Sequence, residues 1–160
     1  MKRLLLAALT AILMTTPTLA ETIETSTGLI IPVYPDWTQE TVNGSTQLKP
    51  AYGGGFFQIT DKALDSLDDE HRDYAYFLCE MNDVNTDGYK IANIRNDKLF
   101  GIGCAYEDLI ITTNGISYAQ RLFFVNNGGL TTVTYVCDVG KMDQYENEFN
   151  MWIDSFQFKE

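Results

Sequence analysis

The clearest structural signal in the sequence is a β-hairpin followed by an amphipathic helix near the C-terminus. Residues 118–125 and 130–136 are rich in aromatic and β-branched side chains, and Asn126-Asn127-Gly128-Gly129 between them is a typical hairpin turn. Apolar residues then recur every three or four positions from Met142 to Phe156, which predicts a closing helix with one buried face. A hairpin and a helix that must each bury one face restrict the chain to layers of sheet and helix.

The segments before this hairpin predict further strands and a second helix. Apolar residues at spacings of three and four predict a helix over Asp61–Met81, with several acidic residues near its start. Glu21–Ser26 is polar, and we expect a loose N-terminal segment there. The sequence therefore predicts one α+β domain over residues 21–160, in which two helices pack on an antiparallel sheet. The other predicted strands are Gly28–Tyr34, Gln47–Ala51, Phe56–Thr60, Tyr89–Asn93 and the alternating run Phe100–Tyr106.

The first twenty residues have the order of a secretory signal peptide. Lys2 and Arg3 precede an apolar run, and Thr18-Leu19-Ala20 provides a small-residue cleavage site. The apolar run is shorter than the roughly 20 residues that span a bilayer, so we expect no stable membrane insertion. The residue directly after Ala20 is Glu21 and not a cysteine, which argues against a lipid anchor. The pattern over residues 1–20 predicts a bacterial protein that is periplasmic or secreted.

The remainder of the chain is strongly acidic. The whole sequence has 11 Lys and Arg against 22 Asp and Glu. Because Lys2 and Arg3 lie in the predicted signal, the mature part keeps nine basic and all 22 acidic residues, a net charge of −13. Such a charge repels nucleic acid and anionic lipid and attracts a basic protein or a cation. Acidity of this kind also serves solubility alone.

Three cysteines, Cys79, Cys104 and Cys137, predict one disulfide and one spare thiol in an oxidising compartment. The strand pattern favours Cys79 with Cys104, because Cys104 shares the apolar face on which the predicted helix of Cys79 packs. Cys137 falls two strands away from Cys104 in a simple meander, too far for a bond. With no Cys-x-x-Cys and with His71 as the only histidine, the sequence does not predict a zinc site.

A calcium-loop motif is the sharpest local signal for a ligand. Asp83, Asn85 and Asp87 alternate ahead of Gly88, as in the first half of an EF-hand loop. The twelfth position, where a bidentate glutamate belongs, is Ile94. Calcium would therefore need further oxygens from elsewhere, and Asp97, Glu107 or Asp108 would have to complete the shell. The competing interpretation is a plain turn after a helix, which favours the same residue types.

No set of residues in the sequence predicts catalysis. Gly115-Ile116-Ser117-Tyr118-Ala119 is faintly similar to a nucleophile elbow, but it opens a hairpin strand, and the only histidine precedes it. A sugar hydrolase with a pair of catalytic carboxylates stays an alternative, because a chain with 22 acidic residues always contains pairs of them. We therefore expect a protein that is not an enzyme, and no cofactor apart from the calcium candidate.

The run Leu29-Ile30-Ile31-Pro32-Val33-Tyr34-Pro35-Asp36-Trp37 resembles the opening strand of the PsbP-like superfamily, in which apolar residues precede a proline and then a tryptophan. The closing hairpin and the helix that stops at Ser155-Phe156 resemble the end of the same superfamily, which includes DcrB-like periplasmic domains. The resemblance implies a PsbP-like α+β fold. It also implies a binding role without enzymatic activity.

Two functions fit these observations. The first is a non-enzymatic binding module of the cell envelope that engages a protein partner through its acidic surface. The second is an immunity or inhibitor protein that neutralises a basic envelope-targeting toxin or wall hydrolase, because opposite charge accelerates capture. Both require a protein partner, with basic chemistry favoured by the charge of this chain.

Overall fold

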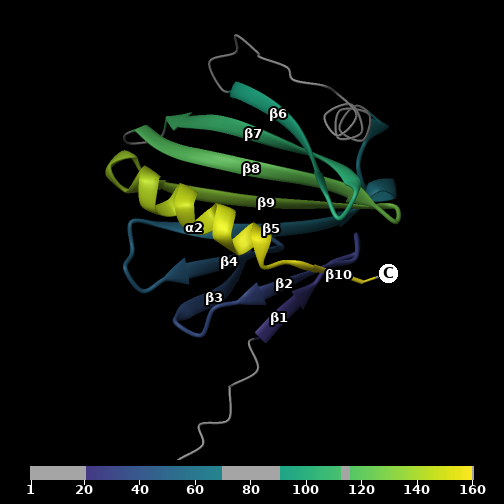
Figure 1. Ribbon diagram of the computed structural model, residues 1–160, viewed down its shortest axis with the longest axis horizontal. Coiled ribbons are helices and arrows are strands. Elements are labelled where there is room, and N and C mark those ends of the chain that lie inside the picture. Colours follow the sequence, from purple (N-terminus) through teal and green to yellow (C-terminus); the bar gives the residue numbers. More distant parts are fainter. Residues whose placement is uncertain (1–20, 70–90, 113–115, 160) are drawn as a thin grey trace, which may run out of the picture.

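The structure, a computed structural model, describes residues 21–69, 91–112 and 116–159 (Figure 1). Its elements form a three-stranded sheet, a seven-stranded sheet and helix α2, together with two short 3₁₀ segments, η1 and η2. The element bounds are β1 Glu21–Glu24, β2 Leu29–Val33, β3 Trp37–Val42, β4 Ser45–Pro50, β5 Gly55–Ala63, η1 Leu64–Ser66, β6 Ile91–Leu99, β7 Ile102–Thr112, β8 Ile116–Asn126, β9 Gly129–Asp138, η2 Val139–Lys141, α2 Met142–Asp154 and β10 Gln157–Phe158.

The large sheet is antiparallel throughout and has the order β3-β4-β5-β9-β8-β7-β6. Its centre is the pairing of β5 with β9, which joins the early hairpins to the later ones. The small sheet has the order β1-β2-β10, so the last strand of the chain pairs with the second. The predicted antiparallel sheet with a closing helix is confirmed.

The predicted hairpin near the C-terminus forms as β8 and β9, with Asn127 and Gly128 at its tip. Both tip residues have positive φ, 50° and 73°, as a type I′ turn requires. Phe100 and Gly101 make the same turn between β6 and β7, with φ values of 54° and 79°. An aromatic residue in the left-handed region is uncommon, and Phe100 gains a stacked contact with Phe158, centroids 5.6 Å apart.

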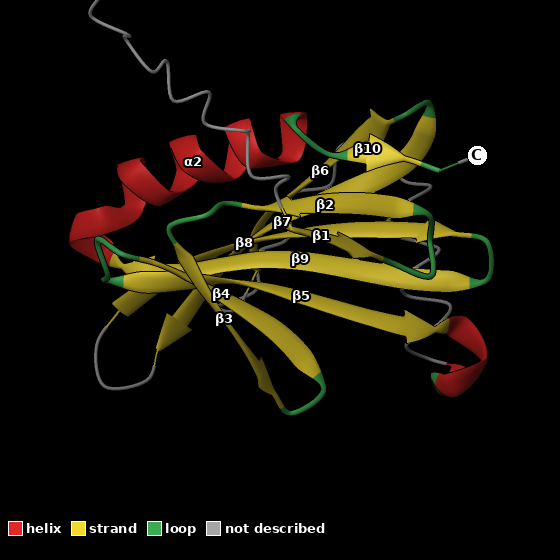
Figure 2. Cartoon of the chain, turned by 90° about the horizontal axis from the view of Figure 1, so that it is seen from below, coloured by secondary structure: helices red, strands yellow, loops and turns green. Residues whose placement is uncertain are grey.

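The core lies between α2 and one face of the large sheet, with the small sheet beside it (Figure 2). The periodicity predicted this arrangement, since α2 points its apolar stripe at the sheet. The strands contribute alternate residues, as the pattern BiBiBiBiBe along β9 shows. The largest fully buried side chains are Trp152, Tyr145, Phe57, Phe124, Phe149, Leu29, Ile31, Leu48, Leu122, Val133 and Thr27.

Two sequence predictions are corrected. The helix predicted to begin at Asp61 does not begin there, because β5 continues through residues 61–63 opposite Thr131, Leu130 and Gly129. The 3₁₀ segment η1 follows, and residues 70–81 of the predicted helix lie outside the described residues. Glu21–Ser26 is not loose either, since β1 pairs with β2 along its whole length. In both places ladder hydrogen bonds outweigh the local composition.

Cys104 on β7 and Cys137 on β9 are both buried, with β8 between them. Cys104 pairs with Phe124 of β8, whereas Cys137 pairs with Tyr118, so about 20 Å of strand separates the two positions. The predicted distance between these two cysteines is confirmed, and the described residues contain no disulfide. Cys79 lies outside them, so its pairing with Cys104 stays a prediction.

Candidate functional site

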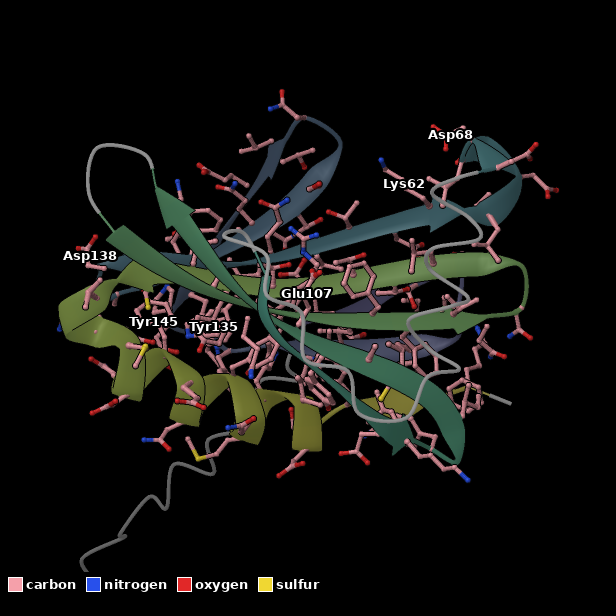
Figure 3. The ribbon with its side chains drawn as sticks, turned by 90° about the horizontal axis from the view of Figure 1, so that it is seen from above. Lys62, Asp68, Glu107, Tyr135, Asp138 and Tyr145 are labelled. Carbon is pink, nitrogen blue, oxygen red and sulfur yellow. The ribbon has the colours of Figure 1, made fainter. Side chains whose placement is uncertain are left out.

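Aromatic contacts fix the orientation of helix α2 on the sheet. Trp152 is unexposed and donates its Nε1–H to the carbonyl oxygen of Pro32 at 2.7 Å. Its ring meets those of Trp37 and Phe57 edge-on, with centroids 5.3 and 5.2 Å apart. Tyr145 packs against Tyr135 of β9, with centroids 6.3 Å apart (Figure 3). Because these contacts hold one side of the helix, the residues on its other side form a fixed surface.

That outer side, which we call the acidic helix face, has three exposed carboxylates, and Lys141 at its N-terminal border donates from Nζ to Gln144 Oε1 at 3.5 Å. Met151 lies on the same side of the helix, next to these carboxylates, and is 63% exposed. Val139, 49% exposed, lies just before the helix, so two of the three exposed large hydrophobic side chains in the described residues lie here. Methionine is enriched in protein-binding surfaces, whose rims are polar. The face comprises Asp143, Gln144, Glu146, Asn147, Asn150, Met151 and Asp154.

A hydrogen-bonded pair borders this face at the N-terminal half of α2. The hydroxyl of Tyr52, from the loop after β4, donates to the carboxylate of Glu148. The hydroxyl of Tyr145 donates to the carbonyl oxygen of Gly53 at 3.3 Å. The rings of Tyr52 and Tyr145 meet edge-on with centroids 5.4 Å apart. These contacts attach the helix to the loop between β4 and β5.

Three titratable groups of this region have pKa values that are raised further above neutral pH. Burial, followed by the hydrogen bond and charge of Glu148, raises the pKa of Tyr52. Burial raises the pKa of Tyr145 to about 12, with the nearby Cys137 adding to the shift. Burial also raises the pKa of the Cys137 thiol from 9.0 to about 11, helped by the charge of Asp138. All three groups stay protonated near neutral pH, so this cluster supplies structural hydrogen bonds rather than a nucleophile or base.

A polar network holds the loop before β2 at the far end of the sheet. The backbone N–H of Ser26 donates to Asp61 Oδ2 at 2.7 Å, and its hydroxyl donates to Oδ1 at 2.9 Å. The hydroxyl of Thr131 also donates to Asp61 Oδ1, at 2.9 Å. The unexposed Thr27 hydroxyl lies 2.6 Å from that of Thr131. Both carboxylate oxygens of Asp61 are therefore used in holding the loop before β2 against the large sheet.

The sheet face turned away from α2 contains a buried carboxylate. Glu107 of β7 is 2% exposed, and its Oε2 lies 3.7 Å from the guanidinium of Arg121, the residue opposite on β8. The same guanidinium lies 5.5 Å from the ring centroid of Phe123. The side chain of Arg121 is 37% exposed, so the pair reaches from the interior to solvent.

The ligand motifs predicted from sequence fall in different parts of the chain. Asp83, Asn85 and Asp87, the calcium candidates, lie outside the described residues, so calcium binding stays a prediction. Within residues 21–69, 91–112 and 116–159, no three His, Cys, Asp or Glu side chains come together as a metal site. In the same ranges, no helix is long and apolar enough to cross a bilayer.

Sequence reasoning located α2 but missed both the acidic helix face and the role of Asp61. The first could have been found, because Asp143, Glu146 and Asp154 occupy the polar positions of the predicted helix. The second had no local signal. Asp61 is 35 residues from Ser26 and 70 from Thr131, and the β5–β9 register that brings them together is a long-range feature.

No protein-family model and no curated protein matches the sequence. Solved structures do match the fold. The cyanobacterial PsbP protein CyanoP of Synechocystis sp. PCC 6803 is 11% identical with a TM-score of 0.61, over 87% of this chain and 92% of CyanoP. A Bacteroides thetaiotaomicron VPI-5482 protein is 11% identical with a TM-score of 0.52, over 86% of this chain and 47% of its own length. LpqN, involved in cell envelope biogenesis of Mycobacterium tuberculosis, is 10% identical with a TM-score of 0.47, over 92% of this chain and 88% of LpqN.

Proposed function

We propose that this chain, which has the fold of cyanobacterial PsbP, is a non-enzymatic binding module of the bacterial cell envelope that engages a basic protein partner. The fold alone does not determine a function, so the proposal depends on the site. The location is proposed from the signal-peptide pattern of residues 1–20.

The acidic helix face is the single observation that carries the proposal. It combines three exposed carboxylates with an exposed Met151 on a helix whose other side is locked into the core. A rigid surface loses little conformational entropy on binding, which favours a specific complex. The carboxylates would steer a basic partner, and Met151 would supply apolar contact beside them.

A salt-dependent capture experiment tests this proposal. The mature chain is immobilised, exposed to periplasmic extract of its source bacterium, and washed at about 50 and about 300 mM NaCl, since salt screens surface charges. We expect capture of a basic protein at low salt and its release at high salt. The test variant carries Asp143→Lys, Glu146→Lys and Asp154→Lys, and should lose the partner.

The matched control carries Glu21→Lys, Asp36→Lys and Asp65→Lys, three exposed acids that are not part of α2. It has the same net charge as the test variant and should keep the partner. Equal loss in both variants would show that net charge acts without a specific face, and retention in both would place the contact elsewhere. If the captured protein is a wall hydrolase or toxin that the mature chain inhibits at equal molar amounts, the function narrows to immunity.

A further inference from the structure

Strand β3 ends the large sheet and has β4 as its single neighbour in the described residues. The two-residue turn at Asn43-Gly44 makes Val42 and Ser45 a hydrogen-bonded pair. Hydrogen-bonded and non-hydrogen-bonded pairs alternate along an antiparallel hairpin. Gln39 and Thr41 therefore belong to non-hydrogen-bonded pairs, and their backbone N–H and C=O groups point away from β4. No hydrogen bond within the described part of the chain uses these four groups. They form a free edge that can pair with another strand.

The other strands at the sheet ends are protected, and β3 is not. Strand β1 has only four residues, with a glutamate at each end, and β10, at the other end of the small sheet, has only two. Strand β6 has a register irregularity between Ile91 and Asn93, and its sequence includes Arg95, Asp97 and Lys98. Short length, bulges and charges are the devices by which proteins block edge pairing.

By contrast, β3 has six residues with no proline and no bulge. Its one charged residue, Glu40, pairs with Lys49 of β4, and its side chain stays 46% exposed and open to a residue on an added strand. Residues 38–41 are all exposed. The strand is nevertheless anchored, because the buried ring of Trp37 stacks on Phe57 with centroids 4.6 Å apart and planes 7° apart. A strand held in this way loses little entropy when another strand pairs with it.

We propose that β3 accepts an extended, basic peptide segment as an antiparallel eighth strand of the sheet. Main-chain hydrogen bonds to Gln39 and Thr41 would hold the segment, as in other cases of strand addition. A second copy of this chain fits poorly. Antiparallel pairing that uses all four free groups places Glu40 opposite Glu40 of the other copy, and like charges directly opposite are unfavourable. A Lys or Arg opposite Glu40 removes this repulsion and suits the net charge of −11.

Amide hydrogen exchange of the ¹⁵N-labelled mature chain tests the edge directly. The probes are an acetylated, amidated octapeptide that alternates Lys with Val and a counterpart that alternates Glu with Val. The Lys–Val peptide should slow exchange at the Gln39 and Thr41 amides by about tenfold at about nine times its Kd. The Glu–Val peptide should leave exchange at both amides unchanged.

Gln39→Pro removes an edge N–H that makes no bond to β4, so the hairpin should persist while peptide protection of Thr41 is lost. Gln39→Val keeps the N–H and should keep that protection. Unchanged amide shifts in β5 and β9 show that each variant is folded. Equal protection in the Pro and Val variants, or no protection by the Lys–Val peptide, overturns the proposal. So does protection without peptide that grows with protein concentration, since that identifies a second copy as the occupant.

This surface is separate from the acidic helix face, so the two proposals can fail independently. The variant with Asp143→Lys, Glu146→Lys and Asp154→Lys should still show peptide protection at Gln39 and Thr41. Loss of peptide protection in that variant, with retention in the Glu21, Asp36 and Asp65 control, would place the peptide on α2 and overturn the assignment to β3.

Discussion

One face of the large sheet is aromatic at one end and polar at the other. Ring packing holds α2 at the first end, and hydrogen bonds hold the loop before β2 at the second. Along β5, Phe57 faces α2 and Asp61 faces the loop before β2. Their partners across the ladder on β9 are Tyr135 and Thr131. Figure 3 shows Tyr135 and Tyr145 at the end where α2 begins and Lys62, the neighbour of Asp61, at the opposite end.

The difference lies in what each end requires of its residues. The aromatic end excludes water over large rings, and its stability scales with the apolar area that is buried. The polar end depends on each donor of Ser26 and Thr131 finding an oxygen of Asp61. A lost ring leaves a cavity, whereas a lost acceptor leaves unsatisfied donors, and the first costs more at a fully buried position.

The largest expected effect is therefore at the aromatic end. Trp152→Ala should lower the free energy of unfolding by about 3–5 kcal/mol, because it removes an unexposed ring that contacts Trp37, Phe57 and Phe156. Urea unfolding measures the change. Trp152→Phe keeps an aromatic ring, loses the hydrogen bond to Pro32, and should cost clearly less. Equal costs for Ala and Phe would mean that the hydrogen bond, not the ring, stabilises this end.

Asp61→Ala should cost less, about 1–2 kcal/mol, because it leaves two Ser26 donors and one Thr131 donor without their acceptor at a partly exposed site. The matched control is Asp65→Ala, an exposed acid four residues on, which should stay within about 0.5 kcal/mol of the parent. The same urea experiment measures both. If Asp61→Ala costs no more than the control, the hydrogen bonds of Asp61 do not stabilise the polar end.

The sequence predicted the aromatic end well because its signals are local. The spacing of Tyr145, Phe149 and Trp152 predicts α2, and Asn127-Gly128 predicts the β8–β9 turn. The polar positions of the predicted helix also include the acids of the acidic helix face. Only the structure shows that Met151 is exposed on the same side.

The polar end could not be predicted, because local and long-range preferences conflict there. The acids near Asp61 and the apolar spacing after it favour a helix, but the ladder with β9 extends β5 to Ala63. The same conflict explains why β1 was not predicted, because its polar sequence is stabilised by pairing with β2. Which strand lies at each edge of the sheet also follows from long-range pairing, so the free groups of Gln39 and Thr41 had no signal in the sequence.

A further expected effect is a pH dependence confined to the aromatic end. Burial raises the pKa of the Cys137 thiol from 9.0 to about 11, so the folded chain holds this proton more tightly than the unfolded chain does. The resulting stability is fully present below pH 9 and is lost as the pH rises through about 11. Tyr145, whose pKa is raised to about 12, adds a further loss at still higher pH. Urea midpoints measured from pH 8 upward should therefore fall, and Cys137→Ala should weaken that fall.

Asp61→Ala should lower the midpoint at every pH and leave the alkaline fall intact, because the thiol lies at the other end of the sheet. An alkaline fall that disappears with Asp61→Ala and persists with Cys137→Ala would show that the two ends are not independent.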